Sequence, residues 1–123
     1  MKPKWNKYRS AKPKNWKESY GESIVRKWLK KNRYKFKQEV VFLDLPWYRF
    51  DFYIPKYRIV IEYDGAQHSR PIEAFGGLAY YKKRKRYDNI KGKFVWGHEM
   101  KLIRIKHYDN IEEKLEEKFK KYT

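Results

Sequence analysis

The sequence predicts a mixed α/β fold of the α+β type, in the order helix, strand, strand, strand, helix, strand, helix. Two short stretches between residues 49 and 64 alternate apolar side chains with period two, as strands do. Three longer stretches without proline have the apolar spacing or the composition of helices. The 123 residues suffice for one compact domain, which we place at residues 18–123.

The first 17 residues are expected to form a flexible basic arm ahead of this domain. They include seven Lys and Arg, no acid and two prolines, with Trp and Tyr interleaved. Such an arm either contacts phosphates or only keeps the chain soluble. The candidate phosphate contacts are Lys4, Lys7, Arg9, Lys12 and Lys14.

A helix is predicted from residue 19 or 20 to residue 32, because Val25, Trp28 and Leu29 belong to an apolar stripe at helical spacing. Glu22 lies on that stripe. A carboxylate in the first turn is favoured by the helix dipole, and a carboxylate on the core side of a helix can also belong to a site. Both interpretations stay open for Glu22.

Three strands are predicted next, over residues 36–43, 49–54 and 58–64. If residues 55–58 form the turn between the last two, Ile54 pairs with Ile59, and Asp51 then lies directly across from Glu62. Period two also places Asp51, Glu62 and Asp64 on one face of the sheet and leaves the apolar residues of the segment 50–54 on the other face. A one-residue slip would exchange the two faces.

The three acids of this hairpin predict a metal site. Like charges directly opposite one another are destabilising, so a divalent cation between Asp51 and Glu62 best explains the pair. Carboxylate oxygens suit Mg²⁺, and Mn²⁺ accepts the same ligands. The candidate ligands are Asp51, Glu62 and Asp64; the alternative is an ordinary solvated sheet face.

The remainder of the chain supplies a helix, a strand and a helix, over residues 78–91, 101–107 and 110–122. A loop with several glycines precedes the first of these helices and can approach a ligand closely. That helix carries a run of basic residues that is either a solvated face or a second phosphate contact. The run consists of Lys82, Lys83, Arg84, Lys85 and Arg86.

The charge of the chain predicts its partner. Lys and Arg number 32 against 15 Asp and Glu, which gives a formal net charge of +17 and indicates a polyanion such as nucleic acid. Tyr and Trp among the basic residues can also stack on bases. Cysteine is absent, which excludes disulfide partners and thiolate zinc sites. No apolar run has the length of a membrane span, so we expect a cytoplasmic protein without a membrane partner.

Four short motifs in this order resemble the core of the PD-(D/E)XK nuclease superfamily, the restriction-endonuclease-like fold. They are Glu22 in GESIVRKWL, Asp51 in RFDFYIP, His68 in IEYDGAQH and Asp88 in RYDNIK. Within the superfamily the motifs are most similar to the very-short-patch repair endonucleases and the phage-type homing endonucleases with the EDxHD signature. The resemblance covers about residues 20–107 and implies a mixed central sheet flanked by helices.

The resemblance also implies an activity, the Mg²⁺-dependent or Mn²⁺-dependent hydrolysis of phosphodiester bonds in DNA. Asp51 would be the central metal ligand, His68 would activate water or stabilise the leaving group, and Glu22 and Asp88 would orient or complete the site. Asp64 stands where most of the superfamily has a lysine, so His68 or Gln67 must do that work. Imidazole can accept a proton near neutral pH, which supports His68 independently.

Other interpretations stay open. The chain could be a non-catalytic basic nucleic-acid-binding protein whose hairpin acids pair with Lys and Arg, or a junction-resolving nuclease of the same superfamily. One active site makes a nick, so cutting both strands would need a homodimer or sequential action. A small nuclease of this pattern is typical of phages and mobile elements, which would place it in the cytoplasm of a host cell.

Overall fold

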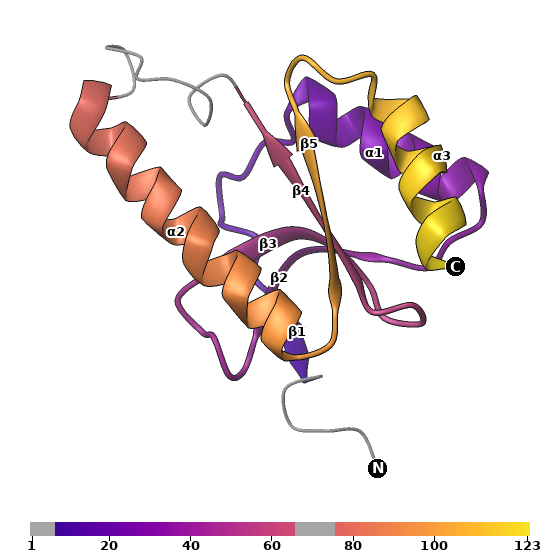
Figure 1. Ribbon diagram of the computed structural model, residues 1–123, viewed down its shortest axis with the longest axis horizontal. Coiled ribbons are helices and arrows are strands. Elements are labelled where there is room, and N and C mark those ends of the chain that lie inside the picture. The colour runs from indigo at the N-terminus through magenta and orange to yellow at the C-terminus, as the bar shows by residue number, and fades with distance from the viewer. Residues whose placement is uncertain (1–6, 66–75) are drawn as a thin grey trace.

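A five-stranded mixed sheet forms the centre of the protein, with helices on both of its faces (Figure 1). The computed structural model describes residues 7–65 and 76–123. The strands lie in the order β1-β2-β3-β4-β5, antiparallel except for β5, which is parallel to β4. The structure therefore confirms a mixed α+β fold. In chain order the elements are β1 (Tyr8–Ser10), α1 (Tyr20–Lys31), β2 (Lys37–Phe42), β3 (Arg49–Ile54), β4 (Ile59–Asp64), α2 (Gly77–Gly97), β5 (Lys101–Lys106) and α3 (Ile111–Tyr122).

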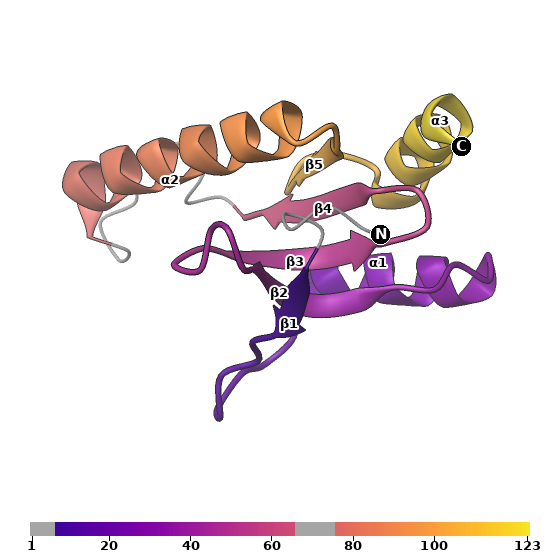
Figure 2. The same ribbon diagram turned by 90° about the horizontal axis from the view of Figure 1, so that it is seen from below.

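Each face of the sheet has its own apolar core. On one face α1 and α3 pack side by side, and Trp28 of α1 contacts Phe119 of α3 with the ring centroids 5.0 Å apart. On the other face the C-terminal half of α2 covers β2, β3 and β4 through Phe94 and Val95. Figure 2 shows α1 and α2 on opposite sides of the strands. Because β4 is covered on both faces, Val60 is buried as completely as Ile61.

The prediction of a flexible arm over residues 1–17 is wrong for residues 8–10, which form the edge strand β1. Its register places Tyr8 opposite Phe42, and the Tyr8 ring packs edge-on against Tyr53 at 5.2 Å. Backbone hydrogen bonds continue the pairing on either side, from Ala11 N to the Glu39 carbonyl and from Leu43 N to the Lys7 carbonyl. A strand of three residues has no recognisable periodicity, and its tertiary partners alone establish it.

The side-chain alternation along β2 and β3 is interrupted at one point, where Glu39 lies opposite Asp51. Side chains that period two would put on one face of the sheet lie on opposite faces on either side of this point. The flanking pairs are Gln38 with Phe52 and Val40 with Phe50. Glu39 has a φ of 52°, in the left-handed region, and this conformation interrupts the alternation of side chains along the strand. The expectation that Phe50 shares a face with Phe52 and Ile54 is therefore wrong: Phe50 belongs to the core under α2, and Phe52 to the core under α1.

The helix α2 is longer than the predicted segment 78–91 and packs only through its second half. Apart from Gly77, its buried residues begin at Asp88 and include Phe94 and Val95, which hold the additional turns against the sheet. The basic run lies in the first half. None of the helices in the described part of the chain has the combination of length and apolar character that a bilayer span requires.

Candidate metal centre

Three carboxylates from three different elements converge at the point where the side-chain alternation of β2 and β3 is interrupted. Glu22 of α1, Glu39 of β2 and Asp51 of β3 each place one carboxylate oxygen within 4.8 Å of the others. Such a spacing is short enough for one cation to contact all three side chains. Of these residues, the sequence predicted Glu22 and Asp51 and missed Glu39.

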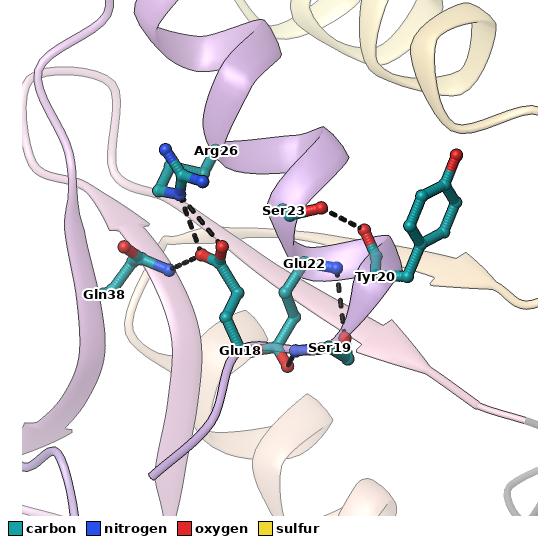
Figure 3. Close-up of polar contacts among 7 residues, drawn as sticks. All are labelled: Glu18, Ser19, Tyr20, Glu22, Ser23, Arg26 and Gln38. Carbon is teal, nitrogen blue, oxygen red and sulfur yellow. Dashed lines mark hydrogen bonds and ion pairs between the residues drawn. The ribbon is translucent and has the colours of Figure 1, made fainter.

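Glu22 is held by the N-terminus of α1. The Ser19 hydroxyl accepts a hydrogen bond from Glu22 N at 3.1 Å, and Glu22 Oε1 accepts one from Ser19 N at 3.2 Å, which together form a capping box (Figure 3). The next residue toward the N-terminus, Gly21, packs so closely on Tyr63 of β4 that a Cβ there would lie 2.2 Å from the ring. This close approach brings the first turn of α1, and Glu22 with it, onto the sheet.

Glu39 is almost completely buried, with 1% of its surface exposed. Its Oε1 forms an ion pair with Arg49 Nε at 2.6 Å, whereas no hydrogen-bond donor from the described part of the chain reaches its buried Oε2. Burial raises the pKa of Glu39 to about 7, the nearby Glu22 carboxylate adds to the shift, and Arg49 opposes it. An unsatisfied buried carboxylate oxygen beside two other carboxylates fits a position that a cation would occupy.

Asp51 belongs to this cluster and also forms hydrogen bonds with the neighbouring strand β4. Asp51 Oδ2 accepts a hydrogen bond from Tyr63 N at 2.8 Å, and Asp51 N donates to Glu62 Oε2 at 3.0 Å. The predicted register is confirmed, because Ile54 pairs with Ile59 and the ladder runs to Phe52 and Ile61, immediately before Asp51 and Glu62. Burial raises the pKa of Asp51 well above its usual value, and the Glu62 and Glu22 carboxylates raise it further.

Glu62 and Asp64, the other two predicted ligands, each have a lysine partner. Glu62 Oε1 accepts a hydrogen bond from Lys91 Nζ at 2.5 Å, and the same ammonium donates to the Arg49 carbonyl at 2.5 Å. Asp64 Oδ2 pairs with Lys106 Nζ at 2.7 Å. Glu62 and Lys91 are both buried, so their charges compensate one another in a poorly solvated region. Lys91 is a second site residue that the sequence analysis missed.

A cavity of about 290 Å³ opens beside Asp51, Glu62 and Asp64. The side chains of Arg84 and Lys91 bring positive charge from α2 to its wall. The cavity thus joins the hairpin acids to the basic helix, and a phosphate group could lie between them. Its aromatic lining residues are Trp47, Tyr48, Tyr63 and Tyr87.

The other predicted residues are placed as follows. Asp88 is a buried residue of α2 itself, and its backbone carbonyl accepts a hydrogen bond from Arg104. Gln67, His68 and Lys4 lie outside the described residues. The remaining basic candidates are on the surface of α2 and around β1, with Arg84 and Lys85 half-buried and the others exposed: Lys82, Lys83, Arg86, Lys7, Arg9, Lys12 and Lys14.

Comparison with known proteins gives no family assignment, because neither a protein-family model nor a curated protein nor a solved structure matches this chain.

Proposed function

We propose that the protein is a metal-dependent endodeoxyribonuclease with a restriction-endonuclease-like core. The observation that carries the proposal is the convergence of Glu22, Glu39 and Asp51, with one buried oxygen of Glu39 unsatisfied among the described residues. A Mg²⁺ or Mn²⁺ ion held by these three carboxylates would polarise a phosphoryl oxygen and lower the pKa of a bound water.

The chain's own residues provide the remaining requirements of phosphodiester hydrolysis. Lys91 and Arg84 present positive charge at the cavity beside Asp51, where they would hold the scissile phosphate and offset the charge that develops on it. The exposed lysines of α2 would hold the backbone on either side, with affinity that depends on salt and not on sequence. His68, with Gln67 beside it, would move the proton between water and the leaving group.

The net charge of +17 supports a nucleic-acid substrate, and DNA is the substrate class that the resembling families cut. One cluster of carboxylates would cleave one DNA strand at a time. A nick is therefore the expected product of a monomer, and a homodimer would be needed to cut both strands at once. Asp88, whose backbone carbonyl is bonded to Arg104, would help to hold α2 against β5. We place the activity in the cytoplasm, that of the host if the protein is encoded by a phage.

A non-catalytic basic nucleic-acid-binding protein is the second candidate, and specific contacts favour it. Three acids of the region already have basic partners: Glu39 pairs with Arg49, Glu62 with Lys91 and Asp64 with Lys106. Ion pairs of this kind can be purely structural. They leave Asp51 and the second oxygen of Glu39 unexplained, and these are the groups on which the nuclease proposal depends.

Cleavage of supercoiled plasmid DNA tests the proposal. The chain is expected to nick the plasmid with Mg²⁺ and not with EDTA. Asp51→Asn should abolish nicking and leave the thermal stability equal or higher, because it removes a like-charge contact with Glu62. Asp44→Asn is the matched control, since Asp44 is exposed in the β2–β3 connection. Full activity of a pure Asp51→Asn preparation would refute the assignment.

A further inference from the structure

Three cavities that share lining residues form a groove along the end of the sheet where β2 begins and the β3–β4 turn lies. Figure 1 shows these two segments at the same end of the sheet. The volumes of the cavities are about 500, 600 and 430 Å³. Tyr8 and Phe36 line both the first cavity and the second, and Tyr34 lines both the second and the third. We call this surface the basic aromatic groove.

The charge of the basic aromatic groove has one sign. Among the described residues that line it, none is acidic, and the basic ones come from four different segments of the chain. The basic residues that line its three cavities are Arg9, Lys12, Arg26, Lys30, Arg33, Lys35, Lys37 and Lys56. A concave surface of uniform positive charge collects polyanions. The hairpin cavity differs from it, because three acids line that wall.

Aromatic side chains line the groove at intervals. The rings are those of Tyr8, Tyr34, Phe36 and Tyr57, all of them half-buried. All four pack against buried core residues. Tyr34, for example, stacks on Trp28 at 5.8 Å, and Phe36 packs on Phe52 at 5.8 Å. Rings fixed in this way, with one side open, lose little freedom when a flat ligand stacks on them.

The groove begins beside the metal centre. Its first cavity is lined by Arg26 and Gln38, and both side chains are held by the carboxylate of Glu18 (Figure 3). Arg26 follows Glu22 by one turn of α1, and Gln38 directly precedes Glu39. A chain that lies in the groove would therefore leave it next to two of the three carboxylates.

From these observations we infer that the basic aromatic groove binds a single-stranded segment of the DNA substrate. This inference rests on the proposed endonuclease function and specifies its substrate, which is DNA with an unpaired strand next to the cleaved phosphate. The aromatic rings favour single-stranded over duplex DNA as the ligand. Stacking on a side chain requires bases whose faces are free, and a duplex hides those faces and offers only its phosphates.

Binding by the full-length chain in EDTA tests the inference separately from cleavage. The probes are a fluorescent oligothymidylate of about 12 nucleotides, within the site size of single-strand grooves, and a duplex of the same length. Tyr57→Leu is expected to weaken binding of the single strand by about fivefold or more, as the loss of one stacked base does, and to leave duplex affinity nearly unchanged. Tyr57→Phe retains the ring and should bind like the wild type.

Charge is tested with a matched pair of double variants. Lys35→Gln/Lys56→Gln should make the slope of log K against log salt shallower by about 1.4 for the single strand, at about 0.7 for each lost contact. Lys27→Gln/Lys120→Gln removes the same charge from exposed positions outside the groove and should leave the slope unchanged. This pair also tests the inference if Tyr57→Leu does not fold.

The outcomes separate the two proposals. Equal losses for single strand and duplex would mean a phosphate site without stacking and would overturn the inference, as would equal effects of the groove and control variants. Failure of plasmid nicking together with the expected loss of single-strand binding would refute the nuclease and retain the groove as a binding surface.

Discussion

Glu39→Gln is expected to stabilise the metal-free protein at pH 8 and to have little effect near pH 5. The folded-state pKa of Glu39 is about 7, against 4.5 for the unperturbed group, because burial disfavours its charged form. The folded protein therefore retains a proton that the unfolded chain releases, and its stability falls as the pH rises from about 4.5 to about 7. Gln resembles the protonated acid and has no charge to bury.

The size of the effect follows from the two pKa values. Their separation corresponds to at most about 3 kcal/mol of unfolding free energy above pH 7. For a chain of this length about 1 kcal/mol shifts the melting temperature by about 4 °C, so the gain at pH 8 is at most about 12 °C. The ion pair with Arg49 is already included in the folded-state pKa of Glu39, and the raised pKa of Asp51 adds a slope of the same sign that both proteins share.

Thermal unfolding in EDTA, followed by circular dichroism between pH 4.5 and 8.5, measures the effect. The wild type should lose stability across this range, and the difference between variant and wild type should grow with pH. Glu116→Gln is the matched control, because Glu116 is exposed on α3. A difference between Glu39→Gln and the wild type that is the same at pH 5 and pH 8 would refute the reasoning.

Three further predictions address the chemistry, the buried ion pair and the basic helix. His68→Ala should lower the Mg²⁺-dependent cleavage rate by about 10²- to 10⁴-fold and leave DNA affinity in Ca²⁺ nearly the same, so near-normal cleavage would remove the EDxHD assignment. Lys91→Met leaves Glu62 buried without its partner and should cost about 3–5 kcal/mol of unfolding free energy; in chemical denaturation the double variant Lys91→Met/Glu62→Gln should recover most of it. Lys82→Gln/Lys83→Gln should make the salt slope of duplex binding shallower by about 1.8, and an unchanged slope would mean that this face is only solvated.

The hairpin of β3 and β4 shows how far local pattern determines structure. Its turn is four residues long, and its strands have a clear period, so the sequence predicts both the Ile54–Ile59 register and the approach of Asp51 to Glu62. The helices α1 and α3 were predictable for the same reason, because their apolar residues recur at helical spacing. The helix α2 was predicted from composition alone and extends six residues farther than expected. Local signals of this kind need no knowledge of the rest of the fold.

The features that the sequence did not reveal depend on distant partners. Glu39 reaches Asp51 only through the β2–β3 register and a left-handed residue inside a strand, which no periodicity predicts for glutamate. Lys91 reaches Glu62 across 29 residues through the packing of α2 on the sheet. One signal for Glu39 was available, since an acid beside the apolar run VVF is at risk of burial and then needs a partner.

The central claim is that Glu22, Glu39 and Asp51 hold one divalent cation. Electron paramagnetic resonance measures this binding directly, because free Mn²⁺ gives a sharp signal that bound Mn²⁺ no longer contributes to. The account predicts that the wild type and Asp44→Asn bind Mn²⁺ at this site and that Glu39→Gln and Asp51→Asn each lose it. Binding by the two variants with the affinity of the wild type, or no binding by the wild type at millimolar Mn²⁺, would contradict the account.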